Sequence, residues 1–103
     1  MKVYVSNDDS EVSGKLKDFT IVDDVDAADI VLILPGGLGT YYDLFKAIKE
    51  NKKIYLYNKD FFYTPVIKNL YELHLSGMIE KVPSEYMNIE CDLDNIIEKM
   101  KER

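Results

Sequence analysis

Three of the chain's five glycines lie within four consecutive positions, and a threonine follows them directly. The segment reads Pro35-Gly36-Gly37-Leu38-Gly39-Thr40-Tyr41-Tyr42-Asp43. Glycines let the backbone come close to a phosphate group, and the free N–H groups at the start of a helix attract an anion. We therefore predict a phosphate-binding loop made of Gly36, Gly37, Gly39 and Thr40. A tight turn between a strand and a helix, without a ligand, is the alternative interpretation.

An aspartate lies one helical turn after the last of these glycines. Asp43 is expected to face the same opening as Gly39, because residues three to four positions apart share one face of a helix. The carboxylate is a candidate catalytic group. Alternatively, it only complements the positive end of the helix dipole.

A second group of polar residues follows the first predicted strand. Ser6, Asn7, Asp8 and Asp9 should lie at the same carboxyl edge of the sheet as Pro35, where α/β proteins bind their ligands. We predict that these five residues contact the ribose or the base of a ligand. A solvated turn held by side-chain hydrogen bonds is the alternative. The spacing of the carboxylates is not specific for a metal ion, so neither a metal nor a cofactor is predicted.

Three consecutive aromatic residues follow a later strand. Phe61, Phe62 and Tyr63 could stack on a base through their ring faces. Packing in the core beneath the next helix is the alternative.

The alternation of strand and helix signals predicts one domain spanning residues 1–103. Apolar or alternating segments predict strands at residues 2–6, 19–22, 29–34, 53–57 and 87–91. Helical spacing and capping residues predict helices at residues 40–50, 64–76 and 92–101. This order indicates an α/β fold: a compact Rossmann-like three-layer domain with a four- or five-stranded, mainly parallel sheet.

One connection in this arrangement is short. Residues 23–28 are fewer than the dozen or more that a full crossover between parallel strands takes. Either the link contains at most one helical turn, or the strand at 19–22 is not a regular parallel neighbour. The strand order therefore stays open.

Composition excludes several classes of partner. Thirteen basic and nineteen acidic residues give a net charge of −6, which argues against binding to nucleic acid or to an anionic membrane. The longest apolar run, residues 30–34, is far shorter than the ~20 residues of a membrane span. The single cysteine, Cys91, cannot form an internal disulfide. We expect a cytoplasmic protein with a small-molecule ligand.

The glycine segment resembles the PGGxGTxxE signature of the Lonely-Guy family, whose members are also called lysine decarboxylase-like. Asn58-Lys59-Asp60-Phe61-Phe62-Tyr63 and Ser76-Gly77-Met78-Ile79 resemble later motifs of that family, and the likeness runs from about residue 28 to residue 101. Family members are phosphoribohydrolases, which release a base from a nucleoside 5′-monophosphate. The resemblance implies that the glycine loop holds the 5′-phosphate. It also implies that Asp43 replaces a catalytic glutamate, and such a carboxylate stabilises or traps an oxocarbenium-like state.

The chain departs from this family pattern at two points. The family carries a His-x-Arg-Lys segment with a catalytic arginine before the central strand, whereas residues 23–28 contain no basic residue and the only arginine is Arg103. Only 34 residues precede Pro35, so we expect a shortened family member. These departures favour a protein that binds a nucleotide without cleaving it, whereas Asp43 favours cleavage.

A second family fits the same residues. Gly39-Thr40-Tyr41-Tyr42-Asp43-Leu44-Phe45-Lys46-Ala47 is similar to a segment of nucleoside 2-deoxyribosyltransferase-like proteins, in which the acid is the nucleophile that takes the sugar. Both resemblances imply a nucleotide- or nucleoside-binding domain that hydrolyses or transfers at an N-glycosidic bond. A non-catalytic nucleotide sensor or sequestering protein is the alternative. Both families form their sites between subunits, so a homo-oligomer is expected.

Overall fold

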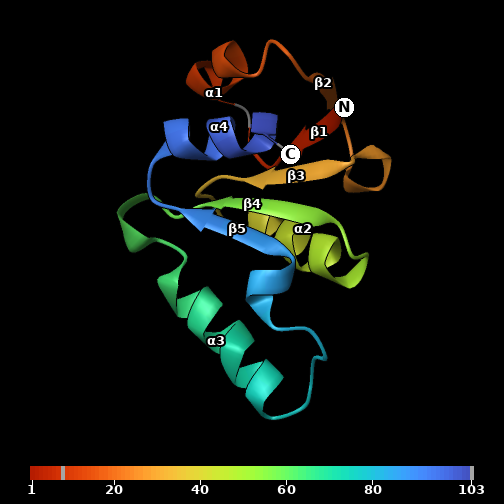
Figure 1. The fold of residues 1–103 in the computed structure, drawn as a ribbon, viewed down its shortest axis with the longest axis vertical. Coiled ribbons are helices and arrows are strands. Elements are labelled where there is room, and N and C mark those ends of the chain that lie inside the picture. Colours follow the sequence, from red (N-terminus) through yellow and green to blue (C-terminus); the bar gives the residue numbers. More distant parts are fainter. Residues whose placement is uncertain (8, 103) are drawn as a thin grey trace.

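The computed structural model describes residues 1–7 and 9–102 of the chain. Strands and α-helices alternate along these residues, with short 3₁₀ turns labelled η between some of them (Figure 1). The elements are β1 (Lys2–Val5), α1 (Ser10–Lys15), β2 (Thr20–Val22), η1 (Val25–Ala27), β3 (Ile30–Ile33), α2 (Leu38–Lys49), β4 (Lys53–Tyr57), η2 (Lys59–Phe61), α3 (Thr64–Leu75), η3 (Pro83–Glu85), β5 (Met87–Glu90) and α4 (Leu93–Glu102).

The described strands form one sheet, which helices cover on both faces. Its order is β2-β1-β3-β4-β5, and every neighbouring pair is parallel. Helices α1 and α4 lie on one face, and α2 and α3 lie on the other (Figure 1). The predicted Rossmann-like three-layer fold is confirmed, with five strands and a wholly parallel sheet.

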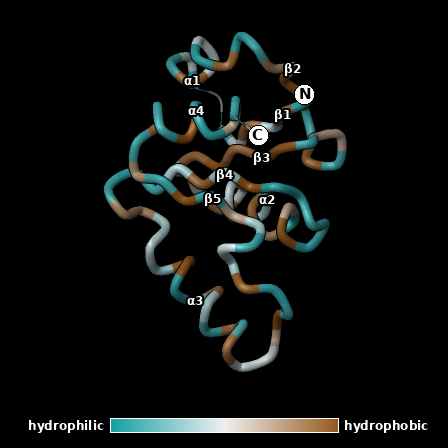
Figure 2. Tube along the Cα trace, in the orientation of Figure 1, coloured by the Kyte–Doolittle hydropathy of each residue, from teal (hydrophilic) through white to brown (hydrophobic). Residues whose placement is uncertain are grey.

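Each face of the sheet has its own apolar core. On the α1–α4 face the buried residues are Val3, Val12, Leu16, Ile30, Leu32, Leu34, Tyr55, Leu93, Ile96, Ile97 and Met100. On the α2–α3 face they are Val25, Ala28, Val31, Ile33, Leu44, Ala47, Ile54, Leu56, Tyr63, Leu70 and Met87. All four residues of β3 are fully buried, which explains the continuous apolar run in the sequence. Apolar residues accordingly gather along the central strands (Figure 2).

The short link between β2 and β3 contains one 3₁₀ turn. The side chain of Asp24 caps this turn by accepting a hydrogen bond of 3.0 Å from the Ala27 N–H. The ammonium group of Lys52 donates to the carbonyl groups of Asp26 and Ala28 at 3.1 and 3.0 Å. Strand β2 pairs in parallel with β1, so the first of the two expected arrangements is confirmed.

Two helices differ from the sequence predictions. Helix α1 was not predicted; it is six residues long, and Asp9 caps it by accepting from the N–H groups of Glu11 and Val12. Helix α2 begins at Leu38 rather than at Thr40, and Gly37 is its N-cap residue.

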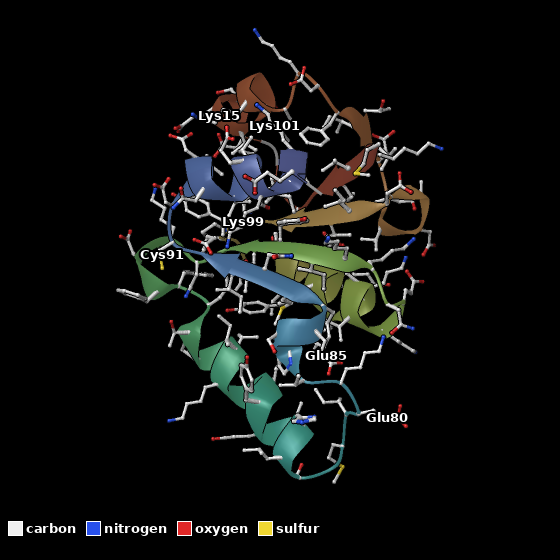
Figure 3. All side chains as sticks on the ribbon, in the orientation of Figure 1. Lys15, Glu80, Glu85, Cys91, Lys99 and Lys101 are labelled. Atoms are coloured by element: carbon white, nitrogen blue, oxygen red, sulfur yellow. The ribbon has the colours of Figure 1, made fainter. Side chains whose placement is uncertain are left out.

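Ion pairs at the surface join α4 to its neighbours. The Lys15 ammonium lies 2.7 Å from the Asp94 carboxylate, and the Lys99 ammonium lies 2.6 Å from Glu90 (Figure 3). Solvent screens exposed pairs of this kind, so they add little stability and the two apolar cores supply most of it. None of the helices in the described part of the chain is both long and apolar enough to span a membrane.

Candidate functional site

The glycine loop lies at the carboxyl edge of the sheet, where the chain changes sides. Strands β1 and β3 are neighbours, yet the chain continues from β1 into α1 on one face and from β3 into α2 on the other. A crevice forms at such a point because the two connections diverge. The loops that follow β1 and β3 therefore define the candidate site.

Gly36 is held tightly by its neighbours. A side-chain carbon at this position would collide with the Thr40 hydroxyl and the Asn7 amide. The Thr40 hydroxyl donates to Asn7 Oδ1 at 3.1 Å, and Asn7 Nδ2 donates to the Pro35 carbonyl. A side chain at position 36 would therefore force Thr40 and Asn7 to shift.

Gly37 and Gly39 have open space around them. A side-chain carbon at either position would meet no atom within 4 Å. Gly37 caps α2 without a side-chain hydrogen bond, and the first turn of the helix contains no acidic residue. Packing does not explain these two glycines. They leave the positive end of α2 accessible to an anion.

Asp43 pairs with a tyrosine of the first strand. Both side chains are half-buried, and the Tyr4 hydroxyl donates to Asp43 Oδ2 at 2.6 Å. Burial raises the pKa of Tyr4 to about 12, with further contributions from this hydrogen bond and from the negative charges of Asp43 and Asp24. Among residues 1–7 and 9–102, no lysine or arginine forms an ion pair with Asp43. The carboxylate is therefore held by a neutral donor.

The polar residues after β1 have different roles. The Ser6 hydroxyl accepts a hydrogen bond of 2.8 Å from the Leu34 N–H, which ties the end of β1 to the start of the glycine loop. Asn7 reaches that loop, and Asp9 caps α1. Asp8 lies outside the described residues. Ser6 and Asn7 thus shape the loop.

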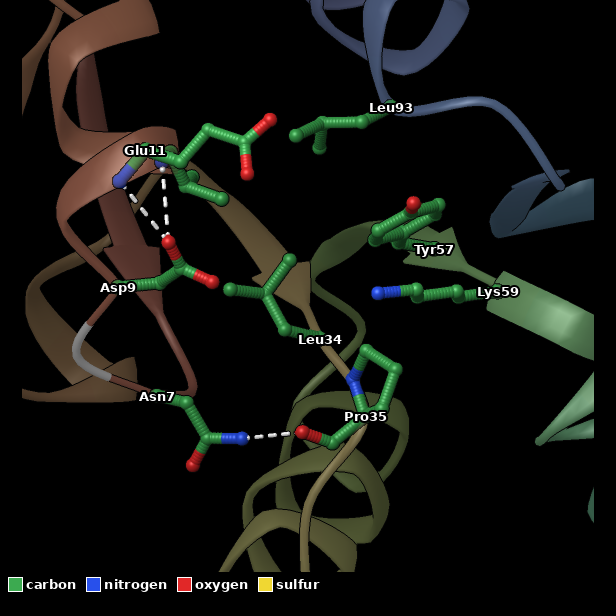
Figure 4. A pocket seen from close by; sticks show the side chains of 9 residues that line it. Asn7, Asp9, Glu11, Leu34, Pro35, Tyr57, Lys59 and Leu93 are labelled. Carbon is green, nitrogen blue, oxygen red and sulfur yellow. Dashed lines mark hydrogen bonds between the residues drawn. The ribbon is translucent and has the colours of Figure 1, made fainter.

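A cavity of about 490 Å³ opens beside the loop, on the α1–α4 side of the sheet (Figure 4). Its lining residues are Asn7, Asp9, Glu11, Val12, Leu34, Pro35, Tyr57, Lys59 and Leu93. Three of the predicted contact residues, Asn7, Asp9 and Pro35, line it together. Asp43 does not, because its side chain lies at Tyr4 on the α2 side. The structure therefore divides the predicted site residues between a cavity and a separate hydrogen-bonded pair.

Sequence reasoning missed three residues of this region. Lys59 and Glu11 line the cavity, and Tyr4 holds Asp43. The sequence did contain a signal for Lys59, because this residue comes two positions after a predicted strand and so belongs at the carboxyl edge of the sheet. The sequence contained no such signal for Glu11, because helix α1 was not predicted. The pairing of Tyr4 with Asp43 joins residues 39 positions apart, so no local pattern indicates it.

The aromatic segment after β4 has a mainly structural role. Tyr63 is fully buried, and its hydroxyl donates to the Leu34 carbonyl at 2.6 Å. Its own N–H donates to the buried Asn58 side chain at 2.6 Å. Phe61 and Phe62 are exposed. Core packing is thus the right interpretation for Tyr63, which anchors the residue before the glycine loop.

No metal centre is visible in the described part of the chain. Within residues 1–7 and 9–102, no three His, Cys, Asp or Glu side chains are grouped so that they could hold a metal ion.

Comparison with known protein families gives one match. The family model described as possible lysine decarboxylase matches residues 23–100, from the link after β2 to the last turns of α4. Its range includes the glycine loop, Asp43 and Lys59. A search of curated proteins found no match to the chain.

Proposed function

Because the chain belongs to the possible lysine decarboxylase family, we propose that it binds a nucleoside 5′-monophosphate, or a nucleoside, at the carboxyl edge of its sheet. The observation that carries the proposal is the contrast among the loop glycines. Gly36 is filled by protein atoms, whereas Gly37 and Gly39 leave open space at a helix start without a side-chain cap. A phosphate group fits that space and charge.

The backbone of the loop supplies the phosphate contacts. N–H groups in the first turn of α2 point along the helix axis and carry its positive end, which attracts a phosphate despite the net charge of −6. Thr40 contributes mainly by fixing the loop, because its hydroxyl is already bonded to Asn7. Gly36, Gly37, Gly39 and Thr40 then form the cradle.

Asp43 is the proposed catalytic group. In hydrolysis the bond between the anomeric carbon and the base nitrogen breaks, and the carboxylate stabilises or traps the positive charge left on the sugar. Water supplies the new hydroxyl on that carbon and a proton for the leaving base. The Tyr4 hydroxyl fixes the orientation of the carboxylate and stays neutral at physiological pH.

A non-catalytic nucleotide sensor or sequestering protein is the second candidate. It is favoured by the surroundings of Asp43, where a tyrosine hydroxyl occupies one carboxylate oxygen. No cation among the described residues is paired with the carboxylate to assist a leaving group. The same phosphate cradle serves either function.

A second copy of the chain is the proposed protein partner. Leu38, Tyr42 and Phe45 are exposed along α2 at positions that share one face of the helix. An apolar stripe of this kind beside the glycine loop is suited to a subunit contact. Light scattering of the purified chain should show a dimer or larger species, and a monomer at high concentration would contradict the proposal.

A thermal-shift screen of nucleosides and nucleoside 5′-monophosphates tests the binding. A ligand at about 100 times its Kd adds about 2.7 kcal/mol of apparent stability, which corresponds to a shift on the order of 10 °C in a domain of this size. Gly37→Val should abolish the shift, because a branched side chain fills the phosphate position. Gly14→Val is the matched control, since Gly14 also has open space around it and lies outside the loop. If no compound of the panel binds, the proposed function is wrong.

Chromatography of the released base separates the two candidates. For an enzyme, Asp43→Asn should reduce base release at least a hundredfold and leave nucleotide affinity within about threefold of wild type. Base release that survives this substitution would remove Asp43 from the mechanism. Binding by the wild type without any release establishes the sensor or sequestering function.

A further inference from the structure

The cavity beside the glycine loop contains charged groups that the proposed function has not yet used. It has a volume of about 490 Å³, within the range of small-molecule sites. Pro35, the first residue of the loop, lines it together with Asn7 (Figure 4). The cavity therefore adjoins the start of the glycine loop.

Opposite charges face each other across this cavity. The Lys59 side chain extends into it from the carboxyl end of β4, and Asp9 and Glu11 extend into it from α1 (Figure 4). The Lys59 ammonium forms no hydrogen bond or ion pair with any residue in the described part of the chain. A free cation in a concave site is well placed to receive an anion from a ligand.

Asp9 and Glu11 form a carboxylate wall of the cavity, which can accept hydrogen bonds from a ligand. Asp9 uses Oδ1 to cap α1, and its second oxygen points into the cavity (Figure 4). The Glu11 carboxylate faces the same space. Apolar side chains of Val12, Leu34 and Leu93 also line the cavity. The cavity thus suits a molecule with an anionic group at one end and hydroxyl groups at the other.

We propose that this cavity binds the phosphorylated sugar of the ligand, with Lys59 contacting the phosphate and Asp9 and Glu11 accepting hydrogen bonds from sugar hydroxyls. A sugar in this cavity lies on the other side of the loop from Asp43, which does not line it, so this binding mode fits the sensor or sequestering function. This assignment rests on the proposed nucleotide function, because Pro35 joins the cavity to the glycine loop that is proposed to bind the phosphate. It names a specificity-determining residue that the glycine motif does not contain.

Lys59→Met tests the assignment, because it removes the charge and keeps most of the side-chain volume. Lys68→Met is the matched control: it changes the net charge equally, and Lys68 is exposed on α3 away from the cavity. Calorimetry would measure the binding of a nucleoside 5′-monophosphate, the corresponding nucleoside, ribose 5-phosphate and inorganic phosphate. Unliganded melting temperatures of both variants should equal that of the wild type, since neither lysine has a partner among the described residues.

We expect Lys59→Met to weaken the monophosphate and ribose 5-phosphate about tenfold and to change nucleoside binding less than twofold. Lys68→Met should change none of them by more than twofold. Ribose 5-phosphate should bind more tightly than inorganic phosphate, because only the former offers hydroxyl groups to the carboxylate wall.

Failure of this assignment differs from failure of the proposed function. If the wild type binds the monophosphate and Lys59→Met leaves its affinity within twofold, the function stands and the role of Lys59 is wrong. Equal losses in both lysine variants would also overturn that role. Ribose 5-phosphate binding that depends on Lys59, without nucleotide binding, would support the cavity assignment and overturn the nucleotide function. If none of the four probes binds, both are wrong.

Discussion

The two sides of the glycine loop use their polar groups differently. On the α2 side, Tyr4 donates to Asp43 and the side chains of Asn7 and Thr40 close around Gly36. On the α1–α4 side, Lys59 has no partner among the described residues and faces a cavity of about 490 Å³. The first side is tied to the fold, and the second is open to a ligand. Gly36 and Thr40 of the glycine motif therefore help to shape the loop, while Lys59, which lies outside that motif, faces the open space beside it.

Among the substitutions that test this comparison, those of the loop glycines should have the largest effect on the free energy of unfolding. Gly36→Ala should lower the free energy of unfolding by about 1–3 kcal/mol, because the added carbon collides with Thr40 and Asn7. Gly37→Ala should change it by no more than about 0.5 kcal/mol, since its carbon meets no atom within 4 Å. Urea unfolding measures both. Equal stability losses at the two positions would mean that the loop is uniformly packed and that the contrast is wrong.

The sequence predicted the loop well because its signals are local. The apolar run of β3, the glycines and the amphipathic α2 are contiguous, so a glycine-rich turn between a strand and a helix at a sheet edge follows from a single stretch of chain. Helix α1 was missed because six residues are too few to show helical periodicity, although Asp9 and Glu11 could have suggested its start.

The cavity was less predictable because it depends on strand order. Lys59 meets Asp9 and Glu11 only because β1, β3 and β4 are consecutive in the sheet, and the short link at residues 23–28 left that order open. The Tyr4–Asp43 pair likewise depends on how deeply α2 packs against β1, which no local pattern encodes. Residue types were visible in the sequence, whereas their pairing required the tertiary structure.

Unfolding at alkaline pH tests the α2 side of the loop, where Tyr4 donates to Asp43. Tyr4 ionises near pH 10 when exposed, and its pKa is raised to about 12 in the fold. Its contribution is fully present below pH 10 and is lost as the pH rises through about 12, because ionisation places a second negative charge beside Asp43. Tyr4→Phe should cost about 1 kcal/mol at neutral pH through the lost hydrogen bond, and it should reduce the loss of stability between pH 10 and 12.

Tyr63 provides an internal reference for the alkaline unfolding of Tyr4→Phe. The pKa of Tyr63 is also raised to about 12, by burial and by the nearby Tyr41, so part of the alkaline loss should remain in Tyr4→Phe. The difference in tyrosinate absorbance between the wild type and Tyr4→Phe, followed alongside unfolding, isolates the ionisation of Tyr4. An unchanged alkaline profile in Tyr4→Phe would show that the Tyr4–Asp43 hydrogen bond contributes nothing to the fold.

Asp9 gives the smallest expected effect on stability and the sharpest test, because it belongs to both the fold and the cavity. One of its oxygens caps α1, and the other faces the cavity. Asp9→Ala should lower the free energy of unfolding by about 0.5–1 kcal/mol through the lost cap, whereas Asp9→Asn should retain the cap and stay within a few tenths of wild type. Both substitutions remove the carboxylate, so both should weaken ribose 5-phosphate binding relative to inorganic phosphate. If only the alanine variant loses binding, Asp9 acts through the position of α1, and the open side of the loop depends on the fold as much as the closed side does.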